Sequence, residues 1–159
     1  MTSTALDMLE DSLNQKLEIM NKIQEENSKQ KELLSDSDNV DPEAFDKTLD
    51  NKGEYIDKLN GIEDSFQILF ENVKADVGDN KELYNCQIKR IQELIKAIDS
   101  ARASIEEEEH NNKALAEKYF SNERAKMSAG KKNSAAAFNY YQTMSKSKDI
   151  PPQFMDQKN

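Results

Sequence analysis

The feature that most constrains this chain is a heptad pattern of apolar residues between Phe45 and Val77. Taken at alternating steps of four and three residues, eight of its ten positions are apolar. A spacing of 3.5 residues keeps one side of an α-helix against a neighbouring helix, as in coiled coils and helical bundles. The ten positions are Phe45, Leu49, Lys52, Ile56, Leu59, Glu63, Phe66, Phe70, Val73 and Val77.

The residues at both ends of this pattern predict where the helix begins and ends. Asp41 is a good N-cap and Pro42 suits the first helical position, while Gly78 is the residue type that most often follows the last turn. A further row, formed by Tyr55, Ile62 and Leu69, widens the apolar side. A helix with so wide an apolar side needs two neighbours. We therefore expect it to be central, with seven residues buried: Phe45, Leu49, Ile56, Leu59, Phe66, Phe70 and Val73.

A weaker heptad pattern before it predicts a first helix over about residues 4–35. Its apolar positions are Leu6, Leu9, Leu13, Met20, Ile23 and Leu34, and its polar interruptions are Lys16, Asn27 and Gln30. These interruptions indicate a looser partner. Asn27 is expected to be a half-solvated position. The alternative is a buried polar group that sets the register of the helices.

A third helix is predicted from Asp79, where Asp79 and Glu82 resemble a capping box, to a point before Gly130. Its heptad positions are Tyr84, Ile88, Ile91, Ile95, Ile98 and Ile105. The pattern fails at Arg102 and Glu109. At about 45 residues, or roughly 70 Å at 1.5 Å per residue, this helix would extend beyond its partners.

These patterns predict an all-α fold: an antiparallel up-down-up three-helix bundle or coiled coil with a long third helix and a short C-terminal helical segment. The single domain divides into a scaffold, residues 1–112, and an extension and tail, residues 113–159. Charge changes sign close to that boundary. Residues 1–109 carry 27 acidic and 13 basic side chains, whereas residues 110–159 carry 4 acidic and 9 basic.

Composition excludes several function classes. The net charge of −9 opposes binding to nucleic-acid phosphates. No apolar run is long enough to span a membrane and the first ten residues do not form a signal peptide, so we expect a cytoplasmic protein without stable membrane insertion. With one cysteine, Cys86, one histidine and no glycine-rich phosphate loop, we expect no enzyme activity and no cofactor. We expect Cys86 to be a small, partly buried side chain rather than a reactive thiol.

Four polar residues, in two pairs, need separate predictions. Glu107 and His110 have the Glu-x-x-His spacing of di-iron bundles, but one histidine cannot complete such a site and four consecutive glutamates surround a helix. We expect a solvated surface there and no metal. Lys52 and Glu63 interrupt the strongest pattern, and we expect their charged ends to reach water. A buried pair between Lys52 and a polar group of the first or third helix is the alternative.

Two stretches resemble the FlgN-like flagellar export chaperones. The first is Leu49-Asp50-Asn51-Lys52-Gly53-Glu54-Tyr55-Ile56-Asp57-Lys58-Leu59 with Phe66-Gln67-Ile68-Leu69-Phe70. The second is the tail, from Phe138-Asn139-Tyr140-Tyr141 to Pro151-Pro152-Gln153-Phe154-Met155-Asp156-Gln157-Lys158. The similarity extends over most of the chain.

The resemblance implies an all-helical chaperone without catalysis. Its client would be a terminal helical segment of a hook-associated (hook–filament junction) protein, and it would also contact the flagellar export gate or its ATPase complex. The alternative is a structural coiled-coil adaptor or dimerisation protein without a client, and the sequence leaves the oligomeric state open. We expect the client to bind after about residue 112. The predicted contact residues are Leu115, Tyr119, Phe120, Met127, Phe138, Tyr140, Tyr141 and Met144.

Overall fold

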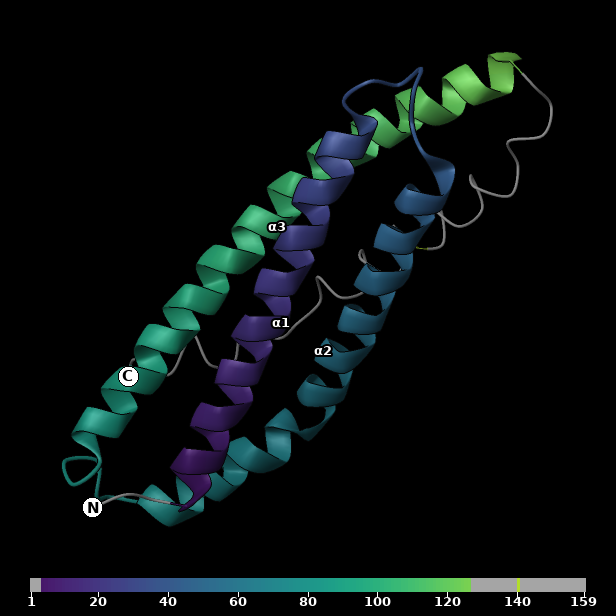
Figure 1. Cartoon of the computed structure of the whole chain (residues 1–159). Coiled ribbons are helices and arrows are strands. Elements are labelled where there is room, and N and C mark those ends of the chain that lie inside the picture. The colour runs from purple at the N-terminus through teal and green to yellow at the C-terminus, as the bar shows by residue number, and fades with distance from the viewer. Residues whose placement is uncertain (1–3, 127–139, 141–159) are drawn as a thin grey trace.

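The computed structural model describes residues 4–126 and Tyr140. These residues form three α-helices: α1 (Thr4–Leu34), α2 (Pro42–Val77) and α3 (Asn85–Lys126) (Figure 1). No β-strand occurs among them. The expected all-α fold is confirmed for this part of the chain, and the boundary expected at residue 112 falls inside the continuous helix α3.

Helix α1 packs along both α2 and α3, and it lies between them in the view of Figure 1. The backbones of α2 and α3 come close at few points, and these two helices meet through long side chains such as Phe45, Lys52 and Tyr119. The prediction that residues 42–77 form the central helix is therefore wrong. The reason lies in α1, whose polar interruptions Lys16, Asn27 and Gln30 are all buried. These side chains form polar contacts with the other helices, so α2 and α3 can pack on two sides of α1.

Interhelical contacts give the directions of the helices. Along α1, Lys16 pairs with Glu63 of α2 and the later Gln30 accepts a hydrogen bond from the earlier Lys52, so α1 and α2 run in opposite directions. The contacts with α3 advance together instead, because Gln87 lies beside Asp7 and Asn112 beside Asn27. Helix α3 thus returns along α1 in the same direction as α1.

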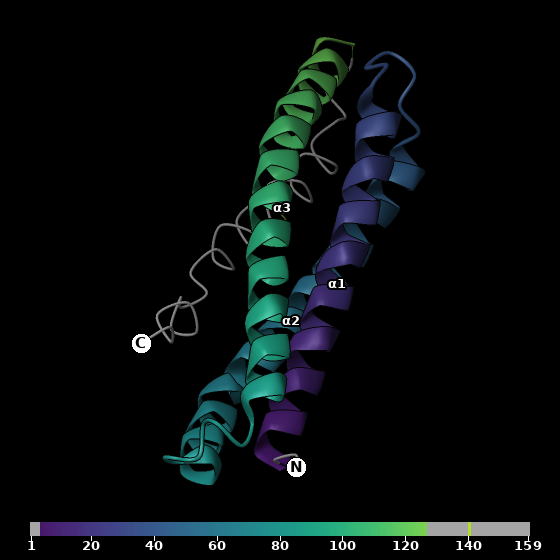
Figure 2. The ribbon, with the colours of Figure 1, turned by 90° about the vertical axis from the view of Figure 1, so that its left-hand side faces the viewer.

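The core of the bundle contains five of the seven residues predicted from the heptad pattern of α2. Phe66 and Val73 differ from the prediction, because they are only partly buried against the core. Both lie in the second half of α2, and Figure 2 shows that the last turns of α2 diverge from α1. The five buried residues are Phe45, Leu49, Ile56, Leu59 and Phe70.

Both predicted ends of α2 are confirmed. The Asp41 carboxylate accepts hydrogen bonds from the backbone N–H groups of Glu43 and Ala44, at 3.1 and 3.3 Å. These are two of the N–H groups that the first turn of a helix leaves without an intrahelical partner. At the other end, Gly78 has a φ of 53° and donates its N–H to the Lys74 carbonyl at 3.0 Å.

The predicted start of the third helix is wrong, because α3 begins at Asn85 rather than at Asp79. Residues 79–84 form turns with i to i+3 backbone bonds, such as that from the Leu83 N–H to the Asn80 carbonyl at 3.1 Å. The chain needs this longer connection because α2 and α3 lie on different sides of α1. Asp79 and Glu82 thus have the spacing of a capping box, but they lie in this turn and do not start a helix.

The end of α3 also differs from expectation. Helix α3 has 42 residues against 31 in α1, but its last turns contact the α1–α2 loop instead of standing free. The Asn122 amide donates to the Ser37 hydroxyl at 2.9 Å, and Lys126 lies 3.6 Å from the Asp38 carboxylate. The extra length of α3 therefore covers the loop end of the bundle.

Gly53 and Gly61 of α2 do not lie at close approaches between helices. A Cβ atom built on either would meet nothing within 4 Å. We therefore predict that Gly53→Ala and Gly61→Ala each raise the free energy of unfolding by about 0.5–1 kcal/mol, since alanine restricts the unfolded chain and favours the helix. Urea unfolding followed by circular dichroism measures this. Gly78→Ala is the control and should destabilise, because an alanine at a φ of 53° is strained.

Candidate functional site: a buried polar layer

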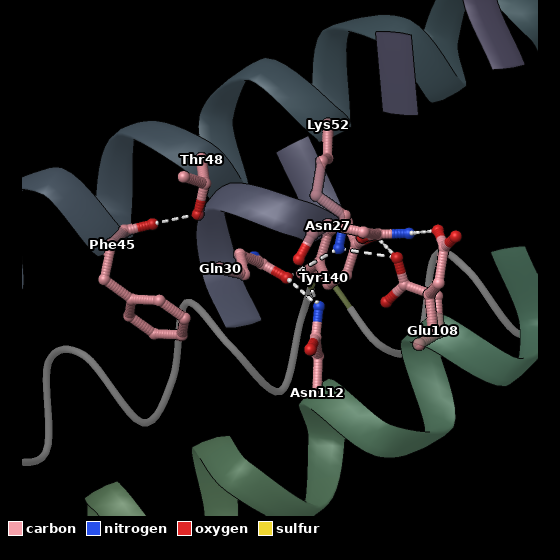
Figure 3. A network of polar contacts seen from close by, with 9 residues as sticks. Asn27, Gln30, Phe45, Thr48, Lys52, Glu108, Asn112 and Tyr140 are labelled. Atoms are coloured by element: carbon pink, nitrogen blue, oxygen red, sulfur yellow. Dashed lines mark hydrogen bonds and ion pairs between the residues drawn. The ribbon is translucent and has the colours of Figure 1, made fainter. Parts of the chain in front are cut away.

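Polar side chains from all three helices meet inside the bundle, in what we call the polar layer (Figure 3). Each of these side chains is at most 6% exposed, so their charges and amides are largely withdrawn from water. Buried polar groups are costly unless they are hydrogen-bonded to one another. The polar layer consists of Asn27 and Gln30 of α1, Lys52 of α2, Glu109 and Asn112 of α3, and Tyr140.

Lys52 is the centre of the polar layer and is fully buried. Its ammonium group lies 2.5 Å from the Glu109 carboxylate of α3 and donates to the Gln30 amide oxygen of α1 at 2.9 Å. One side chain of α2 therefore contacts both other helices. The expectation that Lys52 reaches water is wrong, and the alternative of a buried pair with the first or third helix is confirmed.

Asn27 and Asn112 connect α1 and α3 directly. The Asn112 amide donates to the backbone carbonyl of Asn27 at 2.9 Å and lies 3.4 Å from the Gln30 amide oxygen. The Asn27 amide in turn donates to the half-buried Glu108 carboxylate at 2.9 Å. Asn27 is 1% exposed, so the expectation that it is half-solvated is wrong. Its contacts are those of the alternative interpretation, a buried group that sets the register.

Tyr140 completes the polar layer from outside the three helices. Its hydroxyl donates to Glu109 Oε1 at 2.6 Å, and the Lys52 ammonium lies 4.1 Å from the centre of its ring. The first contact is a short hydrogen bond to a charged acceptor, and the second is a cation–π contact. Tyr140 thus contacts both partners of the buried ion pair at once.

Burial changes the protonation of the lysine. It lowers the pKa of Lys52 from 10.5 to about 8, because the charged ammonium is removed from water, and the nearby Glu109 carboxylate opposes this shift. Hydrogen bonding within the layer is also incomplete. Asn27 Oδ1, Gln30 Nε2 and Glu109 Oε2 have no hydrogen-bond partner among the described residues. Such a layer costs stability and specifies geometry.

Four of the eight predicted contact residues lie within the described part of the chain. Leu115 is partly buried, whereas Tyr119, Phe120 and Tyr140 are 2%, 8% and 6% exposed. Tyr119 and Phe120 pack on Phe45 with ring centres 6.0 and 5.9 Å away. Burial inside the bundle leaves Tyr119 and Phe120 little surface to offer a client. Outside the described residues lie Met127, Phe138, Tyr141 and Met144.

The second polar interruption of α2 is also paired. Glu63 forms an ion pair with Lys16 of α1, and the two side chains are 17% and 4% exposed. Lys16 also lies 5.6 Å from the centre of the Phe66 ring. Glu63 is therefore paired and mostly buried, and the expectation that its charged end reaches water is wrong. This pair lies towards the N-terminal end of α1 and is separate from the polar layer.

The other residues considered for chemistry are on the surface. Glu107 and His110 are exposed, and among residues 4–126 and Tyr140 no three side chains of a metal-ligating type come together. Cys86 is exposed rather than partly buried. None of the helices in the described part of the chain has the length and apolar character needed to cross a membrane.

Part of the polar layer could have been found in the sequence. Lys52 and Glu109 both interrupt heptad patterns, and two opposite charges at buried positions of different helices suggest a pair. Gln30 and Asn112 carry no such signal, because isolated amides at heptad positions are equally typical of a solvated helix edge. Tyr140 was predicted as a contact for a client and not as a partner of Glu109.

Comparisons with known proteins identify no relative: no protein-family model, no curated protein and no solved structure matches this chain. The geometry of the site is therefore the basis for assigning a function.

We predict that the Lys52–Glu109 pair is strongly coupled. Lys52→Met removes the donor that serves both Glu109 Oε1 and Gln30 Oε1, which leaves each of these buried acceptors with one donor fewer, and should lower the free energy of unfolding by about 2–5 kcal/mol. The double variant Lys52→Met/Glu109→Met removes both charges and should recover at least about 1 kcal/mol relative to the sum of the single changes. Urea titrations of the four proteins measure this cycle. Additive effects would contradict a direct interaction.

We also predict a pH dependence that is specific to Lys52. Below pH 8 both the folded and the unfolded chain carry a charged Lys52, so the full cost of burial is present. Between pH 8 and 10.5 the folded chain releases this proton first, so the unfolded chain binds more protons and stability rises with pH, by at most roughly 3 kcal/mol.

The measurement is the free energy of unfolding of the wild type minus that of Lys52→Met, at pH 7.5 and at pH 10. Because both proteins share every other titrating group, the difference isolates Lys52. It should grow towards pH 10. A difference that stays constant or shrinks would show that the Lys52 pKa is not lowered by folding.

Proposed function

We propose that this protein is an export chaperone of the FlgN-like kind. It would bind the terminal helical segment of a hook-associated protein in the cytoplasm and deliver it to the flagellar type III export apparatus, contacting the export gate or its ATPase complex. It would catalyse no reaction and bind no nucleic acid. We further propose that residues beyond Lys126 add a short helical segment to an up-down-up bundle.

One observation carries this proposal: the described members of the predicted contact set gather in one half of the bundle. Leu115, Tyr119 and Phe120 lie on the last third of α3, and Tyr140 returns to the same helix at Glu109. Aromatic side chains supply much of the affinity in interfaces that bind a helix. Their concentration beside a bundle with buried polar contacts favours a protein that holds another chain.

The burial of Tyr119 and Phe120 refines how a client would bind. Both rings lie against Phe45 and expose little surface, so they support the site from beneath. Leu115 is partly buried and offers apolar surface beside them. Direct contact with the client then falls to Leu115 and to the aromatic residues that follow α3, above all Phe138 and Tyr141.

The adaptor alternative is favoured by a different part of the surface. On α2, Ile68 is 64% exposed, and Ile62 and Leu69 beside it are only partly buried. An apolar group of this kind on a helix surface can bind a second copy of the same chain. In that case the second half of α2, and not the residues after α3, would carry the interaction.

We predict that the double variant Phe138→Ala/Tyr141→Ala binds the terminal peptide of a hook-associated protein at least about tenfold more weakly than the wild type, because aromatic anchors dominate such interfaces. Isothermal titration calorimetry with the full-length chain measures the affinity. The control Ile68→Ala removes an exposed apolar side chain on α2 and should leave the affinity unchanged.

The same variants separate the two functions. If no hook-associated peptide binds the wild type, and Ile68→Lys converts a dimer into a monomer in sedimentation experiments, the adaptor alternative replaces the chaperone. If the peptide binds and only Phe138→Ala/Tyr141→Ala weakens it, the client site lies after α3.

A further inference from the structure

The contacts of Tyr140 define a site for a phenol group on the bundle. Lys52 and Glu109, from α2 and α3, form its two walls, and we call it the phenol site. The Lys52 ammonium lies 4.1 Å from the ring centre, and Glu109 Oε1 accepts a hydrogen bond from the Tyr140 hydroxyl at 2.6 Å. The two walls bridge helices whose backbones come close at few points.

The walls of the phenol site are positioned without help from Tyr140. Gln30 of α1 accepts a hydrogen bond from Lys52 at 2.9 Å, and Glu109 lies 2.5 Å from the same ammonium. All three residues belong to helices, whereas Tyr140 comes from outside α1, α2 and α3. The site is therefore a feature of the bundle, and Tyr140 is its occupant.

The chemistry of the two walls selects one side-chain type. A cation beneath the ring favours any aromatic group. A carboxylate at the ring edge also requires a hydrogen-bond donor there, which phenylalanine lacks and the phenol of tyrosine supplies. A lysine or arginine could bind Glu109 but would be repelled by Lys52. Tyrosine satisfies both walls.

We propose that Lys52 and Glu109 form a tyrosine-binding site that Tyr140 occupies in the free chain, and that a tyrosine of the bound client takes its place. The second half of this inference rests on the proposed chaperone function. The exchange replaces one phenol with another, so the buried ion pair is covered both before and after the client binds. Tyr140 then lowers the apparent affinity of the client by competing for the same position.

The site itself is tested without a client, using full-length Tyr140→Gly and two small probes. The first, p-cresol, is the tyrosine side chain as a free molecule, and the second, toluene, lacks its hydroxyl. At about ten times its dissociation constant, p-cresol should raise the melting temperature of Tyr140→Gly by about 3–6 °C. Toluene should raise it less, because it leaves Glu109 without a donor.

Two controls make this result decisive. Tyr84→Gly removes a half-buried tyrosine before α3, away from the phenol site, and both it and the wild type should respond to p-cresol much less than Tyr140→Gly. Tyr140→Phe keeps the ring but loses the hydroxyl, so it should melt below the wild type, while Tyr141→Phe should not. An equal response to toluene, or an equal response of Tyr84→Gly, would overturn the tyrosine site.

The exchange is tested with a tyrosine-containing terminal peptide of a hook-associated protein. If Tyr140 fills its site about 90% of the time, Tyr140→Gly should bind the peptide about tenfold more tightly than the wild type. Replacing the tyrosine of the peptide with phenylalanine should remove this gain. Equal affinities of wild type and Tyr140→Gly would overturn the exchange but not the chaperone. A p-cresol response without any peptide binding would leave the site intact and refute the proposed function.

Discussion

The arrangement of the three helices depends on the buried ammonium group of Lys52. It contacts α1 through Gln30 and α3 through Glu109, although the backbone of its own helix comes close to that of α3 at few points. A charge without solvent cannot accept a shift of one helical turn, because its partners would then leave hydrogen-bonding range. Apolar residues tolerate such shifts far better. A purely apolar heptad pattern does not determine which turn of one helix lies beside which turn of the next. The polar layer determines this register.

The ends of the helices and most of the core could be predicted because they depend on local signals. Asp41, Pro42 and Gly78 define α2 through their own backbone preferences, and the alternation of apolar residues identifies the buried side. The order of packing depends on tertiary contacts instead. Asn27 and Gln30 made α1 look like a loose partner, yet with Lys52 and Asn112 at the same level they are fully buried. Single-helix patterns do not contain that information.

The candidate site was predictable to a smaller degree. The aromatic residues after position 112 were recognised as a group, but sequence spacing does not reveal whether a ring packs inward. Tyr119 and Phe120 pack inward because Phe45, about 75 residues earlier, starts the antiparallel helix beside them. The contact of Tyr140 with Glu109 is of the same kind. It joins residues that are 31 positions apart in the chain, and no local pattern predicts such a contact.

The central position of α1 has a consequence for synthesis. Its contacts with α2 involve partners 22–47 residues away, whereas its contacts with α3 involve partners 80–85 residues away. A hairpin of α1 and α2 can form while the chain is still being translated. The side of α1 that packs on α3, with polar groups such as Asn27, stays exposed to water until α3 emerges from the ribosome. The nascent hairpin thus exposes one side of α1 while about 50 further residues are synthesised, at about 5–20 residues per second.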